Sequence, residues 1–226
     1  MPTLSYFSPW KCFLSYIYDI SIEKTHSPYN AVLEVMLSKG RVRLNGANVT
    51  YSYADLYENF SKTFAHLKIE KKQCERVLVL GFGLGSIPYM LERNFGQKAH
   101  YIGVEIDAEV LRLAQKYMPA DLHSSVNLYC SDAYTFVKKQ HGTYDLITVD
   151  IFIDTQIPEQ FQTADFLKDL KAQLSPKGYL VYNTLTLTYE AGNAARYFFE
   201  NIFCPTLPEA YSLDLTSNLM LIYQNN

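Results

Sequence analysis

The spacing of hydrophobic positions changes along this chain near residue 75. In residues 31–53, apolar and polar positions alternate in two runs on either side of Ser38-Lys39-Gly40. Alternation around a short turn of this kind predicts a β-hairpin. Residues 54–69 then place Leu56, Phe60, Phe64 and Leu67 at helical spacing, which predicts a helix with one apolar face.

Beyond residue 75, short apolar runs alternate with helical patterns. Such strands are buried on both faces, so the alternation predicts a parallel sheet with helices on both sides. Because crossovers of this kind are right-handed, the strands form a Rossmann-like layer. The predicted strands are residues 76–80, 99–105, 126–130, 144–150 and 178–185, followed by a helix from Tyr189 to about Phe199 and a closing strand pair. We therefore expect an α/β fold, with an N-terminal arm, a small hairpin and a helix in residues 1–70 and a Rossmann-like domain in residues 71–226.

Composition and charge narrow the class of protein. The 226 residues are 48% hydrophobic, which excludes a disordered or collagen-like chain. The net charge of −3 argues against broad binding to nucleic acid or to an anionic membrane. The sequence holds no apolar run of about 18 residues, and its N-terminus lacks the pattern of a signal peptide.

Cysteine and histidine spacing adds expectations about compartment and metal. The four cysteines are widely separated, which predicts reduced, mostly buried thiols in a cytoplasmic protein. The five histidines show no spacing typical of metal ligands, so we expect no metal site.

A glycine-rich loop follows the first strand of the alternating region, in the order Gly81-Phe82-Gly83-Leu84-Gly85-Ser86. Its glycines permit a tight turn and close approach of a ligand to backbone N–H groups, next to the positive end of a helix. Ser86 stands where dinucleotide-binding loops carry a third motif glycine. The loop alone therefore leaves a nucleotide site and a purely structural turn equally open.

Acidic residues end or closely follow the next three predicted strands, at Glu105, Asp132 and Asp150. Ligands of open α/β sheets bind at this edge. Glu105 lies 20 residues beyond Gly85, a spacing typical of an acid that binds ribose hydroxyls. Helix capping is the alternative for Asp132, and a capping or solvated acid for Glu105, whereas Asp107 fits the N-cap of the following helix. The convergence of the loop and the three acids predicts a nucleoside site at one rim.

Four segments resemble a known family: GFGLGS, YIGVEIDAEVLRLAQKYM, the SDA of residues 131–133, and YDLITVDIF. They look like class I S-adenosylmethionine-dependent methyltransferases and, within that superfamily, most like spermidine synthases (aminopropyltransferases). The preceding hairpin and helix resemble the small N-terminal β-domain of that branch. The resemblance covers about residues 30–225. It implies a mostly parallel seven-stranded sheet with helices on both faces, and it suggests a homodimer.

The resemblance also implies roles for individual residues. The glycine loop would wrap the methionine-derived part of S-adenosylmethionine or its decarboxylated form, Glu105 would bind the ribose, and Asp132 would face the adenine. Asp154 lies near the place of the catalytic aspartate of spermidine synthases, where a base deprotonates the attacking amine. The residues assigned to cofactor binding are Gly81, Phe82, Gly83, Gly85, Glu105, Ile106, Asp132, Ala133 and Asp150, and those assigned to catalysis are Asp150 and Asp154.

Departures from the family pattern bear on the acceptor. Leu84 stands where spermidine synthases usually carry a loop aspartate, and Asp154 is one position out of register. Where the family has a glutamine and a Tyr-His-Glu cluster, this chain is aligned with Arg43, Ser52, Tyr53 and Ala54. Because a polycationic substrate needs carboxylates, Arg43 is expected to oppose it.

These departures favour a methyltransferase that uses S-adenosylmethionine and a small acceptor, for which the acidic rim allows an amine. Aminopropyl transfer from decarboxylated S-adenosylmethionine is the first alternative. A non-catalytic nucleoside-binding or scaffold relative, and an NAD-dependent oxidoreductase, are the others.

Overall fold

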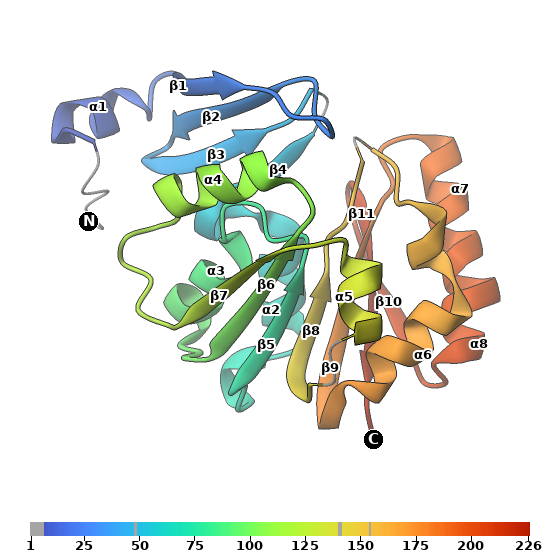
Figure 1. The fold of residues 1–226 in the computed structure, drawn as a ribbon. Coiled ribbons are helices and arrows are strands. Elements are labelled where there is room, and N and C mark those ends of the chain that lie inside the picture. Colours follow the sequence, from blue (N-terminus) through green and yellow to red (C-terminus); the bar gives the residue numbers. More distant parts are fainter. Residues whose placement is uncertain (1–6, 48, 140–141, 154) are drawn as a thin grey trace.

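Two β-sheets dominate the structure, a computed structural model that describes residues 7–47, 49–139, 142–153 and 155–226. The first four strands form an antiparallel sheet that lies above the rest of the chain in Figure 1. The remaining strands form a seven-stranded sheet, in the order β10-β11-β9-β8-β5-β6-β7.

The N-terminal sheet contains the predicted hairpin and two further strands. Its strands are β1 (Ile20–Thr25), β2 (Leu33–Ser38), β3 (Arg41–Asn45) and β4 (Thr50–Ser52), preceded by the short helix α1 (Pro9–Leu14). The hairpin of β2 and β3 is confirmed, and it turns at Lys39 and Gly40, both at positive φ. The run predicted after the turn is two strands, β3 and β4, and β1 was not predicted. The strand β1 escaped the pattern because its positions are only partly buried or exposed.

The seven-stranded sheet confirms the predicted fold class. Strands β5 to β9 are parallel, β11 runs antiparallel to β9, and β10 runs antiparallel to β11. The bounds are β5 Arg76–Leu80, β6 His100–Glu105, β7 Val126–Cys130, β8 Tyr144–Val149, β9 Leu174–Leu185, β10 Tyr211–Leu215 and β11 Asn218–Gln224.

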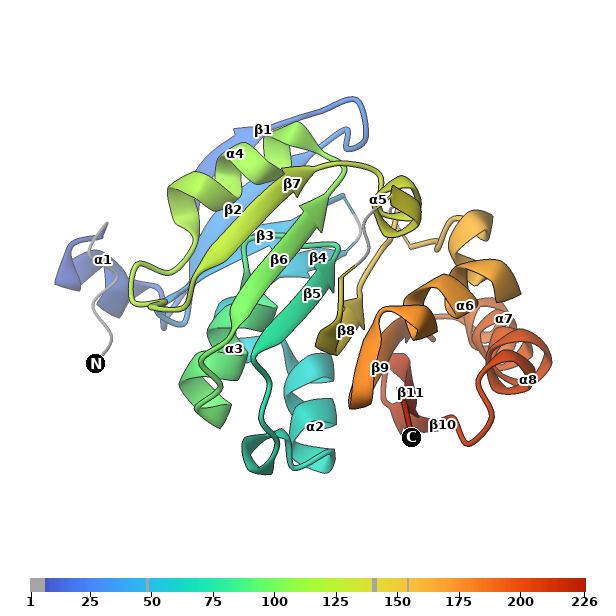
Figure 2. The ribbon, with the colours of Figure 1, turned by 60° about the horizontal axis from the view of Figure 1, so that its bottom comes forward.

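Helices cover both faces of this sheet. Because alternate side chains of a strand point to opposite faces, each strand packs against helices on both sides. Val77 and Val79 of β5 pack with α2 to α4, whereas Leu78 and Leu80 pack with α5 to α7. Figure 2 shows α2 and α3 apart from α6, α7 and α8, with the strands between them. The helices are α2 Glu58–His66, α3 Ser86–Phe95, α4 Ala108–Tyr117, α5 Ala133–Lys139, α6 Ala164–Ala172, α7 Tyr189–Phe198 and α8 Cys204–Thr206, with a π-helical segment Phe199–Phe203 and short 3-10 turns Ala54–Leu56, Ile69–Lys71 and Glu159–Gln162.

The two sheets share one hydrophobic core. Leu33, Val35 and Leu44 of the N-terminal sheet are fully buried and belong to the same cluster as Val77 and Val79 of β5. Each such side chain contributes about 1.5–3 kcal/mol by leaving water. This core contains residues from both sides of the predicted boundary between residues 70 and 71. The division of the chain into two domains stays a prediction.

A polar cluster on the surface also joins the two sheets. Glu23 of β1 accepts hydrogen bonds from Lys116 Nζ at 2.7 Å, Tyr117 Oη at 2.6 Å and Arg112 Nη2 at 2.5 Å. These donors on α4 lower the pKa of Glu23 to about 2. Because the pairs are partly solvated, their net contribution to stability is small.

The structure also tests the expected burial of the cysteines and the expected absence of a membrane-spanning helix. Cys74 is buried, but Cys130 is exposed and Cys12 and Cys204 are only half-buried, so the expectation of mostly buried thiols is wrong. Cys130 is exposed because it ends β7, the edge strand of its sheet. Within the described ranges, every helix is too short or too polar to cross a bilayer.

Candidate active site

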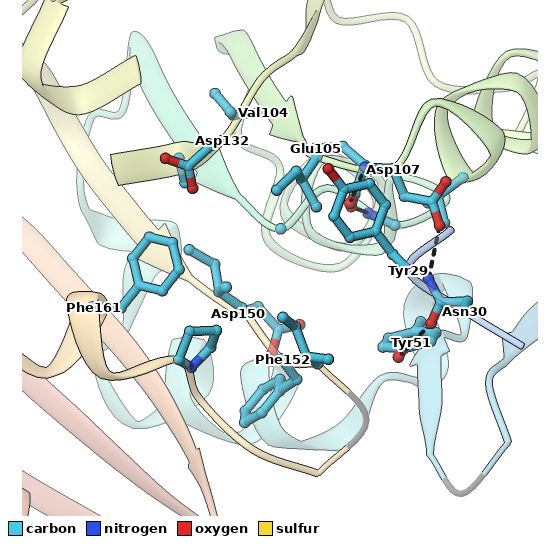
Figure 3. Close-up of a pocket in the computed structure, with 18 of the residues that line it drawn as sticks. Tyr29, Asn30, Tyr51, Val104, Glu105, Asp107, Asp132, Asp150, Phe152 and Phe161 are labelled. Carbon is cyan, nitrogen blue, oxygen red and sulfur yellow. Dashed lines mark hydrogen bonds between the residues drawn. The ribbon is translucent and has the colours of Figure 1, made fainter. Parts of the chain in front are cut away.

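A cavity of about 270 Å³ opens at the carboxyl ends of β5, β6, β7 and β8. The segments that follow these four strands form its floor, and the N-terminal sheet contributes residues to its wall. Figure 3 shows Asp132 and Phe161 at one end of the cavity, Tyr29 and Asn30 at the other, and Asp150 between them. The predicted rim is therefore one continuous cavity.

The glycine loop brings β5 against the end of β8. Gly81 has φ +84°, and a Cβ atom placed on it would lie 2.1 Å from the backbone oxygen of Asp150. Any larger residue at position 81 must displace that backbone, so glycine is required here. Two backbone hydrogen bonds fix the junction, from Gly81 N to Val104 O at 3.0 Å and from Asp150 N to Leu80 O at 2.8 Å.

Glu105 is held by backbone N–H groups. Its Oε2 accepts from Gly83 N at 3.3 Å and its Oε1 accepts from Asp107 N at 3.2 Å. Burial raises the pKa of Glu105, and these backbone hydrogen bonds act in the opposite direction. A carboxylate has about four acceptor positions, so both oxygens retain capacity for two hydroxyl donors of a ribose.

Asp132 takes part in a helix cap and still faces the cavity. Its Oδ2 accepts from Thr135 N at 2.9 Å and Thr135 Oγ1 at 3.0 Å, which caps the first turn of α5. Its Oδ1 accepts from Gln160 Nε2 at 3.1 Å. The capping alternative is thus present, and Oδ1 keeps a further lone pair on the cavity side for an amine such as that of adenine.

Asp150 lies where the glycine loop, β8 and β9 meet. Its Oδ1 accepts from Asn183 Nδ2 at 2.8 Å, and the nearby Tyr57 hydroxyl also favours the ionised carboxylate. Burial raises the pKa of Asp150 to about 6, although both partners act to lower it. Burial and the charge of Asp150 raise the pKa of Tyr57 well above its ordinary value, so that hydroxyl keeps its proton. A carboxylate that titrates near pH 6 suits a general base.

The N-terminal sheet is tied to the rim through Asp107. Its Oδ1 accepts from Glu109 N at 2.9 Å, which confirms the predicted N-cap of α4. Its Oδ2 accepts from Asn30 Nδ2 at 2.7 Å, and Asn30 Oδ1 accepts from the Tyr51 hydroxyl at 2.8 Å. Tyr29 and Asn30 of the β1–β2 connection thereby become part of the cavity wall (Figure 3).

Ser52 attaches the same sheet to the glycine loop. Its Oγ accepts from Leu84 N at 3.1 Å and lies 2.6 Å from Ser86 Oγ, while Ser86 Oγ accepts from Tyr53 N at 2.9 Å. The side chain of Leu84 is 3% exposed and packs in the core shared by the two sheets. The loop therefore presents backbone to the cavity and directs Leu84 away from it.

The structure places most of the predicted site residues together. Phe82 is an exception: its ring is buried against Gly103, where an added Cβ would lie 2.3 Å from Phe82 Cδ2. Gly85 begins α3, away from the described wall, and Asp154 lies outside the described residues. The predicted residues that line the cavity are Gly81, Gly83, Glu105, Ile106, Asp132, Ala133 and Asp150, and their assignment to ligand binding stays a prediction.

Arg43 does not point where the alignment implied. It forms an ion pair with Asp19, with Arg43 Nη2 and Asp19 Oδ2 2.6 Å apart, and its guanidinium lies over the ring of Tyr53 at 5.4 Å. It alternates along β3 with the buried Val42 and Leu44, which face the core. The expectation that Arg43 opposes a cationic substrate in the cavity is therefore wrong.

The sequence analysis did not assign a site role to several residues that the structure brings to the rim. Tyr57, Asn30 and Gln160 line the cavity, and Asn183 contacts Asp150 from β9. Tyr57 was noticeable only as one tyrosine among several. Asn183 gave no clearer signal, because β9 also contains polar residues, among them the adjacent Thr184. Among the residues that the structure describes, no group of three or more acidic, histidine or cysteine side chains is arranged to hold a metal ion.

Similar proteins were found at the level of sequence and of fold. The family model "Spermine/spermidine synthase domain" matches residues 58–198. A polyamine aminopropyltransferase of Vibrio vulnificus is 34% identical over 115 residues, which are 50% of this chain and 38% of the relative. One from Sulfolobus acidocaldarius is 27% identical over 170 residues, 72% of this chain and 56% of the relative. These alignments span less than two thirds of the relatives' own length.

Solved structures show the same fold. Spermidine synthase from Thermotoga maritima superposes with a TM-score of 0.68 at 16% identity, over 92% of this chain and 73% of that one. Human methyltransferase-like protein 13, solved in complex with SAH, gives 0.59 at 19% identity, over 74% and 82%. Both of these sequence relatives carry the name polyamine aminopropyltransferase. With 58–198 matched by the family model, this chain belongs to the spermine/spermidine synthase domain family.

Proposed function

We propose that this protein transfers the aminopropyl group of decarboxylated S-adenosylmethionine to a small amine. The observation that carries the proposal is Asp150, a half-buried carboxylate with a pKa of about 6 that lies against the glycine loop and accepts a hydrogen bond from Asn183. The family match and the names of the sequence relatives support the choice of reaction. Methyl transfer, preferred from sequence, becomes the second candidate.

The rim has the groups that a sulfonium nucleoside needs. Glu105 is fixed by backbone N–H groups and keeps acceptor capacity for the ribose diol. Asp132, with Ala133 and Phe161 nearby in the wall, offers an acceptor and apolar surface to an adenine ring. Gly81 and Gly83 leave room for the methionine-derived part of the nucleoside to approach the loop backbone closely.

The chemistry asks little of the protein beyond position and a proton acceptor. The sulfonium provides a carbon that is already activated. A neutral amine attacks that carbon, a C–N bond forms, the C–S bond breaks, and methylthioadenosine leaves. Asp150 accepts the proton that the amine must lose, and the cavity holds amine and carbon in line.

One observation supports methyl transfer as the second candidate. Leu84 is buried, so the glycine loop offers no carboxylate to the amine of an aminopropyl group. Along the described part of the loop and the end of β8, Asp150 is the acid that remains near this position. If Asp150 acts only on the acceptor amine, no carboxylate remains for the amine of an aminopropyl group. S-Adenosylmethionine, as a methyl donor, would then fit as well.

Product identification by mass spectrometry separates the candidates. The protein is incubated with either nucleoside and a panel of primary amines that includes putrescine and spermidine. We expect methylthioadenosine together with an amine that is heavier by one aminopropyl group, and its loss in Asp150→Asn but not in Asp165→Asn, a change at an exposed acid on α6. S-Adenosylhomocysteine and a methylated product would support the second candidate. Neither product would favour the non-catalytic relative.

A further inference from the structure

Two amide side chains connect Asp150 to the closing strand pair. Asn183 of β9 is 1% exposed, and its Nδ2 donates to Asp150 Oδ1 at 2.8 Å. Its Oδ1 accepts from Asn218 Nδ2 of β11, also at 2.8 Å. Asn218 Oδ1 in turn accepts from Ser217 Oγ at 3.2 Å. Every donor in this series points toward Asp150.

We propose that Asn218 and Asn183 form a positioning relay that keeps Asp150 a hydrogen-bond acceptor. An amide presents a donor at one end and an acceptor at the other, so its orientation decides which state of a neighbouring carboxyl group it favours. Because Asn218 donates to Asn183 Oδ1, the Nδ2 of Asn183 is directed at Asp150. The kinetic consequence rests on the proposed function, but the arrangement of hydrogen bonds does not.

The opposite orientation would have the opposite effect. A reversed Asn183 would present its carbonyl oxygen, with which Asp150 can form a hydrogen bond only when it is protonated. The relay therefore counteracts burial, which by itself favours the protonated acid. In the proposed reaction, it keeps the carboxylate ready to accept a proton near neutral pH.

Other groups that face Asp150 do not replace the relay. The Tyr57 hydroxyl, from the segment before α2, also favours the ionised form of the carboxylate. The Gly81 backbone approaches from the loop after β5, and Glu105 and Asp132 line the same cavity from β6 and β7. The acids among these groups would favour protonation of Asp150, so Asn183 and Tyr57 are the described partners that stabilise its ionised form.

Burial explains why these amides need each other. Asn183 lies in a strand whose neighbours Val181 and Tyr182 are fully buried, and an unpaired amide there would be costly. A single hydrogen-bond partner would satisfy either the Nδ2 or the Oδ1 of Asn183, but not both. The relay satisfies both ends and directs the free donor at Asp150.

The test is a titration of Asp150 by carbon NMR of aspartate carboxyl groups, with the signal assigned by its loss in Asp150→Asn. Asn183→Leu removes the donor but keeps the branching and the number of heavy atoms, and we expect the midpoint to rise by about one pH unit, a tenfold change in proton affinity. Asn218→Leu leaves Asn183 free to turn, and we expect a smaller rise in the same direction. Asn225→Leu is the matched control, because its Nδ2 donates to Leu174 O and Ser175 O at the other end of β9.

Kinetics provide a second readout. With amine and donor saturating, the acid limb of the rate profile should move with the NMR midpoint, while KM for the donor stays within about twofold. Midpoints for Asn183→Leu and Asn218→Leu that equal those of the wild type or of Asn225→Leu would overturn the relay. A midpoint shift in a protein without turnover would instead leave the relay intact and refute the proposed function. If Asn183→Leu does not fold, Asn218→Leu alone decides.

Discussion

Glu105 and Asp150 end the two strands that flank β5, yet they are held in different ways. Glu105 accepts from backbone N–H groups of the two adjoining loops. Asp150 accepts from the side chain of Asn183 and lies near the Tyr57 hydroxyl, and both of these residues come from distant parts of the chain. Burial raises the pKa of both acids, and for Asp150 it reaches about 6.

This difference suggests a division of labour along one rim. Backbone donors fix an acid in place with little dependence on surrounding side chains, which suits recognition of a constant nucleoside. Side-chain donors make the proton affinity of an acid adjustable, which suits chemistry. We therefore propose that the Glu105 half of the cavity serves binding and the Asp150 half serves proton transfer.

The largest effect is expected from Asp150→Asn. An amide cannot accept the proton of the attacking amine, so kcat should fall by about 10²–10⁴-fold. Steady-state kinetics with decarboxylated S-adenosylmethionine and the best amine measure it. Asp165→Asn should keep the rate, and a fall of less than about fivefold for Asp150→Asn would remove the general base from the account.

Glu105→Gln is expected to act on affinity instead of rate. It removes the charge that strengthens hydrogen bonds from the ribose hydroxyls, and such bonds are worth about 1.5–3 kcal/mol each. We expect Kd for the donor to rise about 100-fold, with kcat at saturation nearly unchanged. Glu109→Gln, at a half-buried acid on the first turn of α4 outside the cavity lining, is the matched control. A change confined to kcat would reverse the division of labour.

Gly81→Ala tests the junction between the two halves. A methyl group there must avoid the Asp150 backbone oxygen at 2.1 Å while the residue keeps φ +84°. The strain should lower the free energy of unfolding by about 3 kcal/mol, as measured by urea denaturation. Gly96→Ala shares a positive φ, at +67°, but meets nothing within 4 Å, so about 1 kcal/mol is expected. Equal losses would show that contact with Asp150 is unimportant.

The pH profile is the mildest test. A base with a pKa of about 6 is ionised above that value and protonated below it. The rate should therefore fall about tenfold for each pH unit below 6 and level off above it. Stability has the opposite sign: the raised pKa makes the ionised form costly, so the folded state should gain about 1–2 kcal/mol as pH falls from 7 to 4 relative to Asp150→Asn. A rate that is flat from pH 5 to 8 would exclude Asp150.

The parts predicted well from sequence are those with local signals. Strands β5 to β9 showed continuous apolar runs, and the glycine loop and Glu105 follow them at fixed spacing. Asp107 was predicted as an N-cap from its position alone. All of these depend on residues close together in the chain, where pattern and structure are directly linked.

The remainder depends on tertiary packing. Phe82 was assigned to the cofactor as a loop residue, but Gly103 in the next strand leaves room for its ring in the core. That glycine was a usable signal, because glycine inside a strand often marks a close approach. The partners of Asp150 had no local signal, since Asn183 and Tyr57 meet it only after β9 and α2 have packed. Arg43 was misplaced because one alignment position decides which face of β3 it occupies.

Calorimetric titration with decarboxylated S-adenosylmethionine tests the central claim most directly. We predict binding to the wild type, a Kd about 100-fold higher for Glu105→Gln, and a Kd within about tenfold of the wild type for Asp150→Asn. Absence of binding to the wild type, or equal loss in both variants, would contradict the assignment of binding to one carboxylate and chemistry to the other.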